Sequence, residues 1–132
     1  MSTGESSEHI QIQNGLMNYL KKEGCEIFKA ASRTGYPECD NIGGRVPDMM
    51  GKNSQGLIAI GEAKTCDDLD NERTNDQFKI FSGCTVSSGN MQGQTCPFYI
   101  GIPKSCINEL RQNLAKLGLN NKTNTQIIFF DI

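Results

Sequence analysis

The chain has 132 residues, a length typical of one domain, and 36% of them are hydrophobic, which is enough to close a single core. Its net charge of −2 argues against a protein that coats nucleic acid through charge alone, because neutralising phosphates requires clustered Lys and Arg. The start is polar, unlike a signal peptide, and no stretch approaches the roughly 18 unbroken apolar residues of a membrane span, so we expect a cytoplasmic protein with no membrane contact.

The order of apolar, β-forming and turn-forming residues predicts a flexible tail over residues 1–7 and a single domain over residues 8–132. The predicted elements are, in chain order, a helix over Ser7 to Lys22 with Ser7 as N-cap, strands over Cys25 to Ala30, Arg45 to Met50 and Leu57 to Lys64, a helix over Glu72 to Ser87, a strand over Pro97 to Ile102, a helix over Ser105 to Leu117 and a strand over Gln126 to Ile132. A hairpin connection over Gly51 to Gly56 joins the second and third strands. This order predicts an α/β fold with a mixed central sheet flanked by helices on both faces.

Six cysteines are scattered along the chain without any C-x-x-C pair, which argues against a zinc ribbon or a redox motif. They are Cys25, Cys39, Cys66, Cys84, Cys96 and Cys106. In a reducing cytosol we expect them to be free thiols, several of them in the core.

Two carboxylates and one ammonium group are predicted to meet at the hairpin. Asp48 follows Pro47 on one strand, and Glu62-Ala63-Lys64 ends the next. Because side chains alternate along a strand, Glu62 and Lys64 project to the same face, with Lys64 expected to be exposed at the strand end. Carboxylates and a carbonyl form the oxygen-rich site that Mg²⁺ prefers, and a lysine beside it suits phosphodiester hydrolysis. By itself, Glu-x-Lys also fits a charged strand end with an incidental salt bridge.

Two segments resemble the signature of the PD-(D/E)XK nuclease superfamily: Gly44-Arg-Val-Pro-Asp48 and Ile58-Ala-Ile-Gly-Glu62-Ala-Lys64. The glutamate of the second segment lies 14 positions after the aspartate of the first. That superfamily has a restriction endonuclease-like αβββαβ core and includes Holliday-junction resolvases. Within it, the chain is most similar to the VRR-NUC group, in which a glutamate opens the first helix, as Glu8 does, and a glutamine lies on the helix after the lysine, as Gln77 does. Gly61 departs from the pattern, because relatives often have an apolar or β-branched residue there.

The resemblance implies that Asp48, Glu62 and the backbone carbonyl of Ala63 bind Mg²⁺ or Mn²⁺, that Lys64 is the catalytic lysine, and that Glu8, as a further metal ligand, and Gln77 complete the site. It implies a DNA substrate, with RNA less favoured, and a homodimer, which would present two sites to two strands. Glu8 fits equally well as a first-turn acid favoured by the helix dipole, and Gln77 as an exposed helix residue.

Other charged residues are interpreted more simply. The basic residues predicted near the site, which are candidates for phosphate contacts, are Lys29, Arg33, Arg45, Lys52 and Arg73. The linker acids Asp67, Asp68 and Asp70 are interpreted as solvated loop residues, and His9, the only histidine, as an exposed surface residue.

Two other functions compete with the nuclease. Gly44 to Lys52 superficially resembles a phosphate-binding P-loop, but six residues instead of four separate its glycines, and Asn53 replaces the hydroxyl residue. A non-catalytic nucleic-acid-binding or assembly subunit with the same fold is the stronger rival, since fold does not imply activity. The intact set of Asp48, Glu62 and Lys64 favours the enzyme.

Overall fold

The computed structural model describes residues 6–31 and 35–132, so the candidate phosphate contact Arg33 lies outside the described residues. Its elements are α1 (Ser7–Lys22), β1 (Glu26–Ala30), β2 (Met49–Lys52), β3 (Ile58–Ala63), α2 (Glu72–Ser82), β4 (Phe98–Pro103), α3 (Ile107–Lys116) and β5 (Thr125–Phe130), with 3-10 turns η1 (Cys66–Asp68) and η2 (Lys104–Cys106). This is the predicted order of helices and strands. No helix within the described ranges is both long and apolar enough to cross a membrane.

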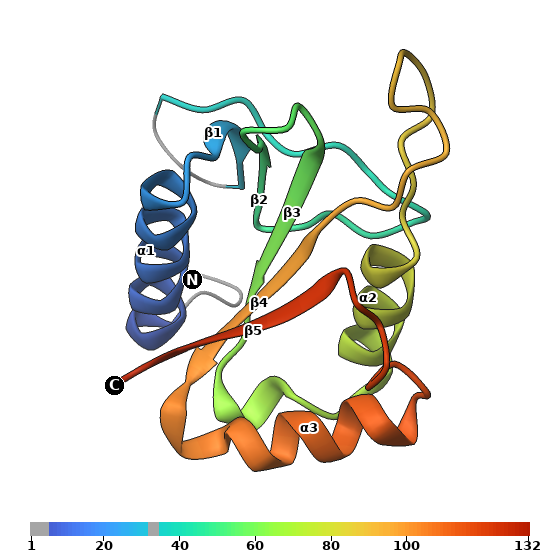
Figure 1. Cartoon of the computed structure of the whole chain (residues 1–132). Helices are drawn as coiled ribbons and strands as arrows, with labels where there is room; N and C mark the ends of the chain where they lie inside the picture. The colour runs from blue at the N-terminus through green and yellow to red at the C-terminus, as the bar shows by residue number, and fades with distance from the viewer. Residues whose placement is uncertain (1–5, 32–34) are drawn as a thin grey trace.

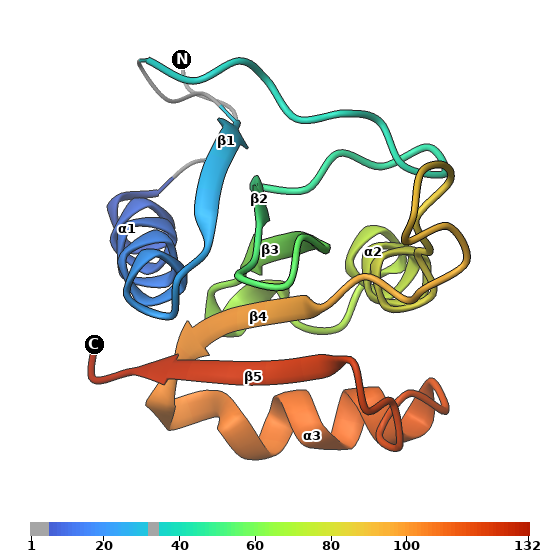
Figure 2. The same ribbon diagram turned by 45° about the horizontal axis from the view of Figure 1, so that its top comes forward.

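The five strands form one mixed sheet in the order β1-β2-β3-β4-β5. The first three pair antiparallel, whereas β3, β4 and β5 run parallel. Helix α1 covers one face, and α2 and α3 cover the other (Figures 1 and 2). The predicted α/β class, with a mixed sheet flanked by helices on both faces, is therefore confirmed.

The alternation of side chains in β3 divides the core into two halves. Ala59 packs toward α1 in a cluster with Leu16 and Met49. Ile60 points the other way and packs in a larger cluster with Phe78 of α2 and Leu110 of α3. Glu62 follows Ile60 at the two-residue period of a strand, so it faces the same side as α2.

Most predicted boundaries differ from the observed ones by one or two residues, and three of the differences have a clear physical reason. The N-cap of α1 is Ser6 and not Ser7, because the Ser6 hydroxyl accepts the His9 N–H at 3.1 Å. Strand β2 begins at Met49 instead of Arg45, since Pro47 has no N–H to donate, and so Asp48 directly precedes the strand. Helix α2 ends at Ser82 instead of Ser87; the following segment forms a narrow hairpin closed by a bridge between Thr85 and Thr95.

Gly61, the departure from the nuclease signature, has a packing reason. A Cβ at this position would lie 2.7 Å from Cγ of Met49 and 3.3 Å from Cδ2 of Leu16. Both neighbours are buried. Glycine therefore lets α1 lie close to the strand that carries Glu62.

The prediction that all six cysteines are free thiols is wrong for one pair. Cys66, in η1, and Cys106, in η2, form a disulfide with a Cα–Cα distance of 5.8 Å. The bond ties the segment after Lys64 to the start of α3. Because the partners are 40 positions apart, no local motif marks them.

Candidate active site

The β2–β3 hairpin brings the two predicted carboxylates together. Met49 lies opposite Gly61 in the register, which places Asp48 next to Glu62. The Asp48 N–H donates to Oε1 of Glu62 at 3.1 Å, and Oδ2 of Asp48 accepts the N–H of Ala63 at 2.8 Å. The Asp48 carboxylate thus accepts a hydrogen bond from the backbone of β3, and the Glu62 carboxylate accepts one from the residue that directly precedes β2.

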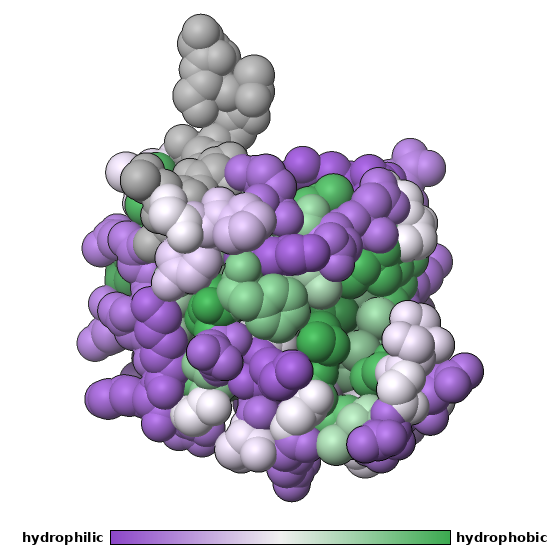
Figure 3. Space-filling model, turned by 90° about the horizontal axis from the view of Figure 1, so that it is seen from above, coloured by the Kyte–Doolittle hydropathy of each residue, from purple (hydrophilic) through white to green (hydrophobic). Residues whose placement is uncertain are grey.

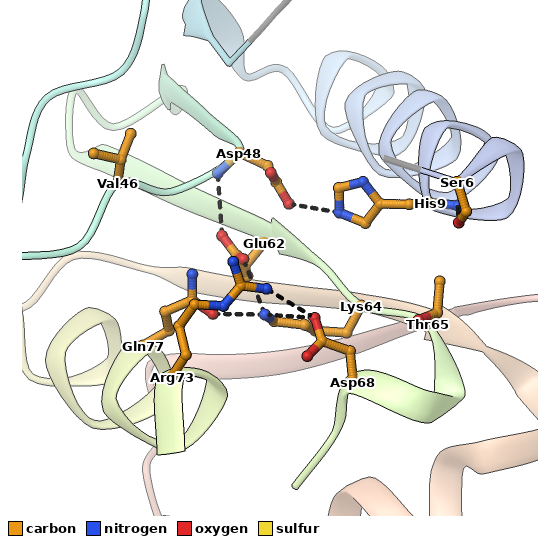
Figure 4. Close-up of a pocket in the computed structure, with 10 residues that line it drawn as sticks. All are labelled: Ser6, His9, Val46, Asp48, Glu62, Lys64, Thr65, Asp68, Arg73 and Gln77. Atoms are coloured by element: carbon orange, nitrogen blue, oxygen red, sulfur yellow. Dashed lines mark hydrogen bonds and ion pairs between the residues drawn. The ribbon is translucent and has the colours of Figure 1, made fainter. Parts of the chain in front are cut away.

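Lys64 is buried and not exposed as predicted, since its exposed fraction is 1%. Its Nζ donates to Oε1 of Gln77 at 2.5 Å and lies 3.3 Å from Oδ2 of Asp68 and 3.5 Å from Oε2 of Glu62. The ammonium group is therefore surrounded by three acceptors from β3, η1 and α2 (Figure 4). Burial follows from α2 and η1, which fold back over the strand end.

These side chains line one pocket of about 250 Å³. Its lining comprises Ser6, His9, Val46, Asp48, Glu62, Lys64, Thr65, Asp68, Arg73 and Gln77 (Figure 4). Four of the five predicted catalytic residues are in this set. Glu8, the fifth, is not among the described residues that line the pocket.

Helix α1 contributes His9 instead of Glu8. Its Nε2 lies 3.1 Å from the carbonyl oxygen of Ala63 and 3.5 Å from Oδ2 of Asp48. Because a carbonyl oxygen only accepts, the contact with Ala63 requires the hydrogen on Nε2. One turn further along, Nε2 of Gln13 donates to Oδ1 of Asp48 at 3.1 Å. The interpretation of His9 as an exposed surface residue is therefore wrong.

The pKa values of two carboxyl groups in the pocket shift in opposite directions. Burial and the charge of Asp48 raise the pKa of Glu62 well above its ordinary value, and Lys64 only partly opposes them. For Asp68, burial acts to raise the pKa, but the hydrogen bond from Asn71 and the charge of Lys64 outweigh it and lower the pKa. Asp68 is thus a fixed anion inside the pocket, contrary to its interpretation as a solvated loop residue.

The candidate phosphate contacts occupy different places. Arg73 lines the pocket, and its Nη2 lies 3.3 Å from Oδ2 of Asp68. Arg45 pairs with Asp76 of α2 at 3.1 Å. Lys29 forms an exposed ion pair with Asp40.

Lys52 lies at a second, larger hollow of about 670 Å³, between the 35–48 segment and the hairpin after α2. At the end of the molecule where these two segments lie, apolar surface is exposed among hydrophilic residues (Figure 3). Lys52 is therefore not part of the acidic pocket, and of the described candidates only Arg73 lines it.

The oxygen atoms of this pocket have the chemistry that a hard divalent cation requires. Asp48 and Glu62, which line the pocket, and the neighbouring Ala63 carbonyl, which contacts Nε2 of His9, offer only oxygen. Burial, and then the nearby charge of Asp48, raise the pKa of Glu62. In the described parts of the chain, no three or more His, Cys, Asp and Glu side chains are arranged to hold a metal. The predicted ligands were Asp48, Glu62, Glu8 and the Ala63 carbonyl, and of these three side chains only Asp48 and Glu62 line the pocket. A metal there would complete its shell with water and substrate oxygens, as Mg²⁺ usually does.

The residues that the sequence interpretation missed are His9, Gln13 and Asp68. Residues four apart in a helix lie on the same face. Ile12, four positions after Glu8, and Gln13, four positions after His9, are both buried, so helical spacing alone does not predict which of Glu8 and His9 faces the pocket. The available signal was Gln13, a polar residue within the apolar stripe of the helix. Asp68 lies four positions after Lys64, but no local pattern distinguishes it from its acidic neighbours.

A scan of family models, a search of curated proteins and a search of solved structures each found no match to this chain.

Proposed function

We propose that this protein is a metal-dependent nuclease that hydrolyses DNA phosphodiester bonds. The observation that carries the proposal is the convergence of Asp48, Glu62 and Lys64 in one pocket, with both carboxylates beside the buried ammonium group. Residues of these types in this spacing are also what the chain shares with the PD-(D/E)XK signature, where they perform this reaction.

Asp48, Glu62 and the carbonyl of Ala63 would hold Mg²⁺ or Mn²⁺. The ion, when bound, would supply Lewis acidity toward the phosphate and lower the pKa of a water molecule. Lys64 would orient the attacking water and stabilise charge that develops on the phosphate. Gln77 holds the Lys64 ammonium group in place at 2.5 Å, which supports a defined position for that charge.

Arg73 is the described candidate that best fits a substrate contact, since its side chain lines the pocket and is largely exposed. A guanidinium group there would bind a non-bridging phosphate oxygen. Recognition through DNA shape, or delivery by a partner, fits so small an interface better than reading a long sequence.

Two features of the proposal remain predictions of the sequence. A homodimer would be rejected by light scattering that gives the 14.5 kDa mass of one chain at high concentration. The cytoplasmic location also stays a prediction, and the disulfide between Cys66 and Cys106 bears on it, because such bonds persist mainly in oxidising compartments.

One observation favours the rival, a non-catalytic subunit that binds nucleic acid. Lys64 is 1% exposed and its ammonium group contacts Gln77, Glu62 and Asp68, an arrangement that also serves a purely structural ion-pair network. A cleavage assay distinguishes the two functions, because the enzyme breaks strands when a divalent cation is present and the non-catalytic subunit does not.

The test is a panel of labelled linear, flapped and four-way DNAs incubated with Mg²⁺, Mn²⁺ or EDTA. We expect cleavage with either metal and none with EDTA. Lys64→Met, which keeps an unbranched side chain in the buried site, should reduce cleavage by about 10² to 10³. Lys79→Met, which changes an exposed lysine on α2, is the matched control and should cleave as the wild type does.

Three results would count against the proposal. Binding of the DNAs without cleavage under any metal would support the non-catalytic subunit. Cleavage that persists in EDTA would contradict the metal dependence. Lys64→Met that retains more than about a tenth of wild-type cleavage at saturating metal would remove the catalytic role of Lys64, even if the chain is a nuclease.

A further inference from the structure

Helix α1 buries an amide where an apolar side chain would pack more favourably. Gln13 has an exposed fraction of 2% and lies on the helix face that also buries Ile12, Leu16 and Met17. Burying an amide is unfavourable unless it is hydrogen-bonded. Its Nε2 donates to Oδ1 of Asp48, a residue 35 positions away. The polar residue in this core is therefore explained by the carboxylate that it contacts.

The Asp48 carboxylate is held at both of its oxygen atoms by donors from different elements. Gln13 donates to Oδ1 at 3.1 Å from α1, and the Ala63 N–H donates to Oδ2 at 2.8 Å from β3. Without Gln13 the remaining contacts, the Ala63 N–H and the more distant Nε2 of His9 at 3.5 Å, both fall on Oδ2, and the carboxylate could turn about that oxygen. Two donors on opposite oxygens fix the plane of the group.

We propose that Gln13 is a positioning residue for Asp48. It sets the carboxylate plane so that Asp48 presents its remaining acceptor capacity to the pocket that it lines with Glu62. The structural half of this proposal, that Gln13 holds the Asp48 carboxylate in one orientation, concerns the protein without metal. The consequence, a higher affinity for a divalent cation, rests on the proposed function, and partners that orient metal ligands typically change affinity by about 10- to 100-fold.

The structural half is tested without metal, by amide hydrogen exchange of the whole chain measured by NMR. The variant is Gln13→Met, which keeps length and shape but removes the donor. The matched control is Gln11→Met, which changes an exposed glutamine two positions away on the same helix. In Gln13→Met we expect the Ala63 amide to exchange at least about tenfold faster, because the carboxylate that accepts it is free to turn.

An internal reference separates this effect from general loosening of the fold. The Ile60 amide, in the same strand, donates to the Pro97 carbonyl at 2.9 Å and should keep its wild-type exchange rate. Gln11→Met should change neither amide. Unchanged exchange at Ala63 in Gln13→Met overturns the proposal, and so does equal acceleration at Ala63 and Ile60, which would indicate a merely structural role for Gln13.

Calorimetry with Mn²⁺ tests the consequence. Gln13→Met should bind Mn²⁺ at least about tenfold more weakly than the wild type and Gln11→Met, and its cleavage should recover as the metal concentration rises. Equal Mn²⁺ affinity in all three proteins overturns this consequence. If the wild type itself neither binds Mn²⁺ nor cleaves DNA, the proposed function fails, while the exchange rates still decide whether Gln13 positions Asp48.

Discussion

Glu62 holds its carboxylate almost completely out of water, at 3% exposure, beside a second carboxylate. Lys64 supplies one positive charge at 3.5 Å, and the Asp48 N–H donates one hydrogen bond. Burial and the Asp48 charge nevertheless raise the pKa of Glu62 well above its ordinary value. The ionised form is thus held in the fold at a free-energy cost, as is common for groups whose arrangement serves a reaction instead of stability.

We expect Glu62→Gln to raise the free energy of unfolding at neutral pH while abolishing cleavage, because a neutral amide of the same shape avoids burying a charge beside Asp48. Lys64 keeps Asp68 and Gln77 as partners in this variant. Denaturant unfolding and the DNA panel measure the two effects. Loss of stability at pH 7 would show that the ion pair with Lys64 outweighs the repulsion.

The same substitution should flatten the pH dependence of stability. Since the folded-state pKa of Glu62 is raised, its contribution is fully present below the ordinary value of 4.5 and is lost as pH rises through the folded-state pKa. The wild type should therefore lose stability relative to Glu62→Gln as pH rises above about 4.5. Unfolding curves between pH 4 and 8 give this difference, and a gap that does not widen with pH would contradict the shift.

For the individual site residues, the predicted hairpin and the alternation of side chains along a strand were enough to predict that Asp48, Glu62 and Lys64 meet. It did not predict that Lys64 is buried, because that depends on Gln77 and Asp68, which come from elements folded over the strand end. The environment of a side chain depends on contacts distant in sequence, which a local pattern does not contain.

Among the elements, the order of helices and strands followed from periodicity, and the errors lie at their ends. Strand β2 was placed too early because Arg45 and Val46 have strand-like composition, whereas the ladder begins only after Pro47. The predicted helix over Glu72 to Ser87 extends past the observed end at Ser82 into the hairpin that follows α2. Ends are decided by caps and by pairing with other elements, which composition reports poorly.

Close packing of α1 on β3 offers a test at the level of elements. We expect Gly61→Ala to lower the free energy of unfolding by roughly 1 to 3 kcal/mol, because the added Cβ would meet Cγ of Met49 at 2.7 Å. Gly101→Ala is the control, since its nearest contacts are at 3.3 Å and its cost should be smaller. Thermal unfolding ranks the two variants. The reverse ranking would mean that Met49 moves aside easily.

Across the whole molecule, the disulfide was beyond prediction because it joins two turns brought together by the parallel crossover from β3 to β4. Six cysteines allow many pairings, and only the three-dimensional arrangement selects Cys66 with Cys106. The fold class, by contrast, followed from the order of elements, since alternating helices and strands have few ways to cover a sheet.

Removing the disulfide should lower the free energy of unfolding by about 2 to 4 kcal/mol, because the bond restricts a long loop in the unfolded chain. The double variant Cys66→Ser/Cys106→Ser tests this by denaturant unfolding. A phosphine reductant should lower the wild-type midpoint to that of the variant and leave the variant unchanged. Equal stability of oxidised wild type and variant would contradict the expected contribution.

The exposed hairpin between Thr85 and Thr95 lies inside the segment that this disulfide closes. A broad-specificity protease that cuts the hairpin would produce two fragments, one with Cys66 and one with Cys106. They would migrate as a single band on a non-reducing gel and separate into two after reduction. The nicked protein would also keep Lys64 and its partners in one fragment, so the peptide connection through the hairpin can be severed without detaching β4, α3 and β5 from the rest of the chain.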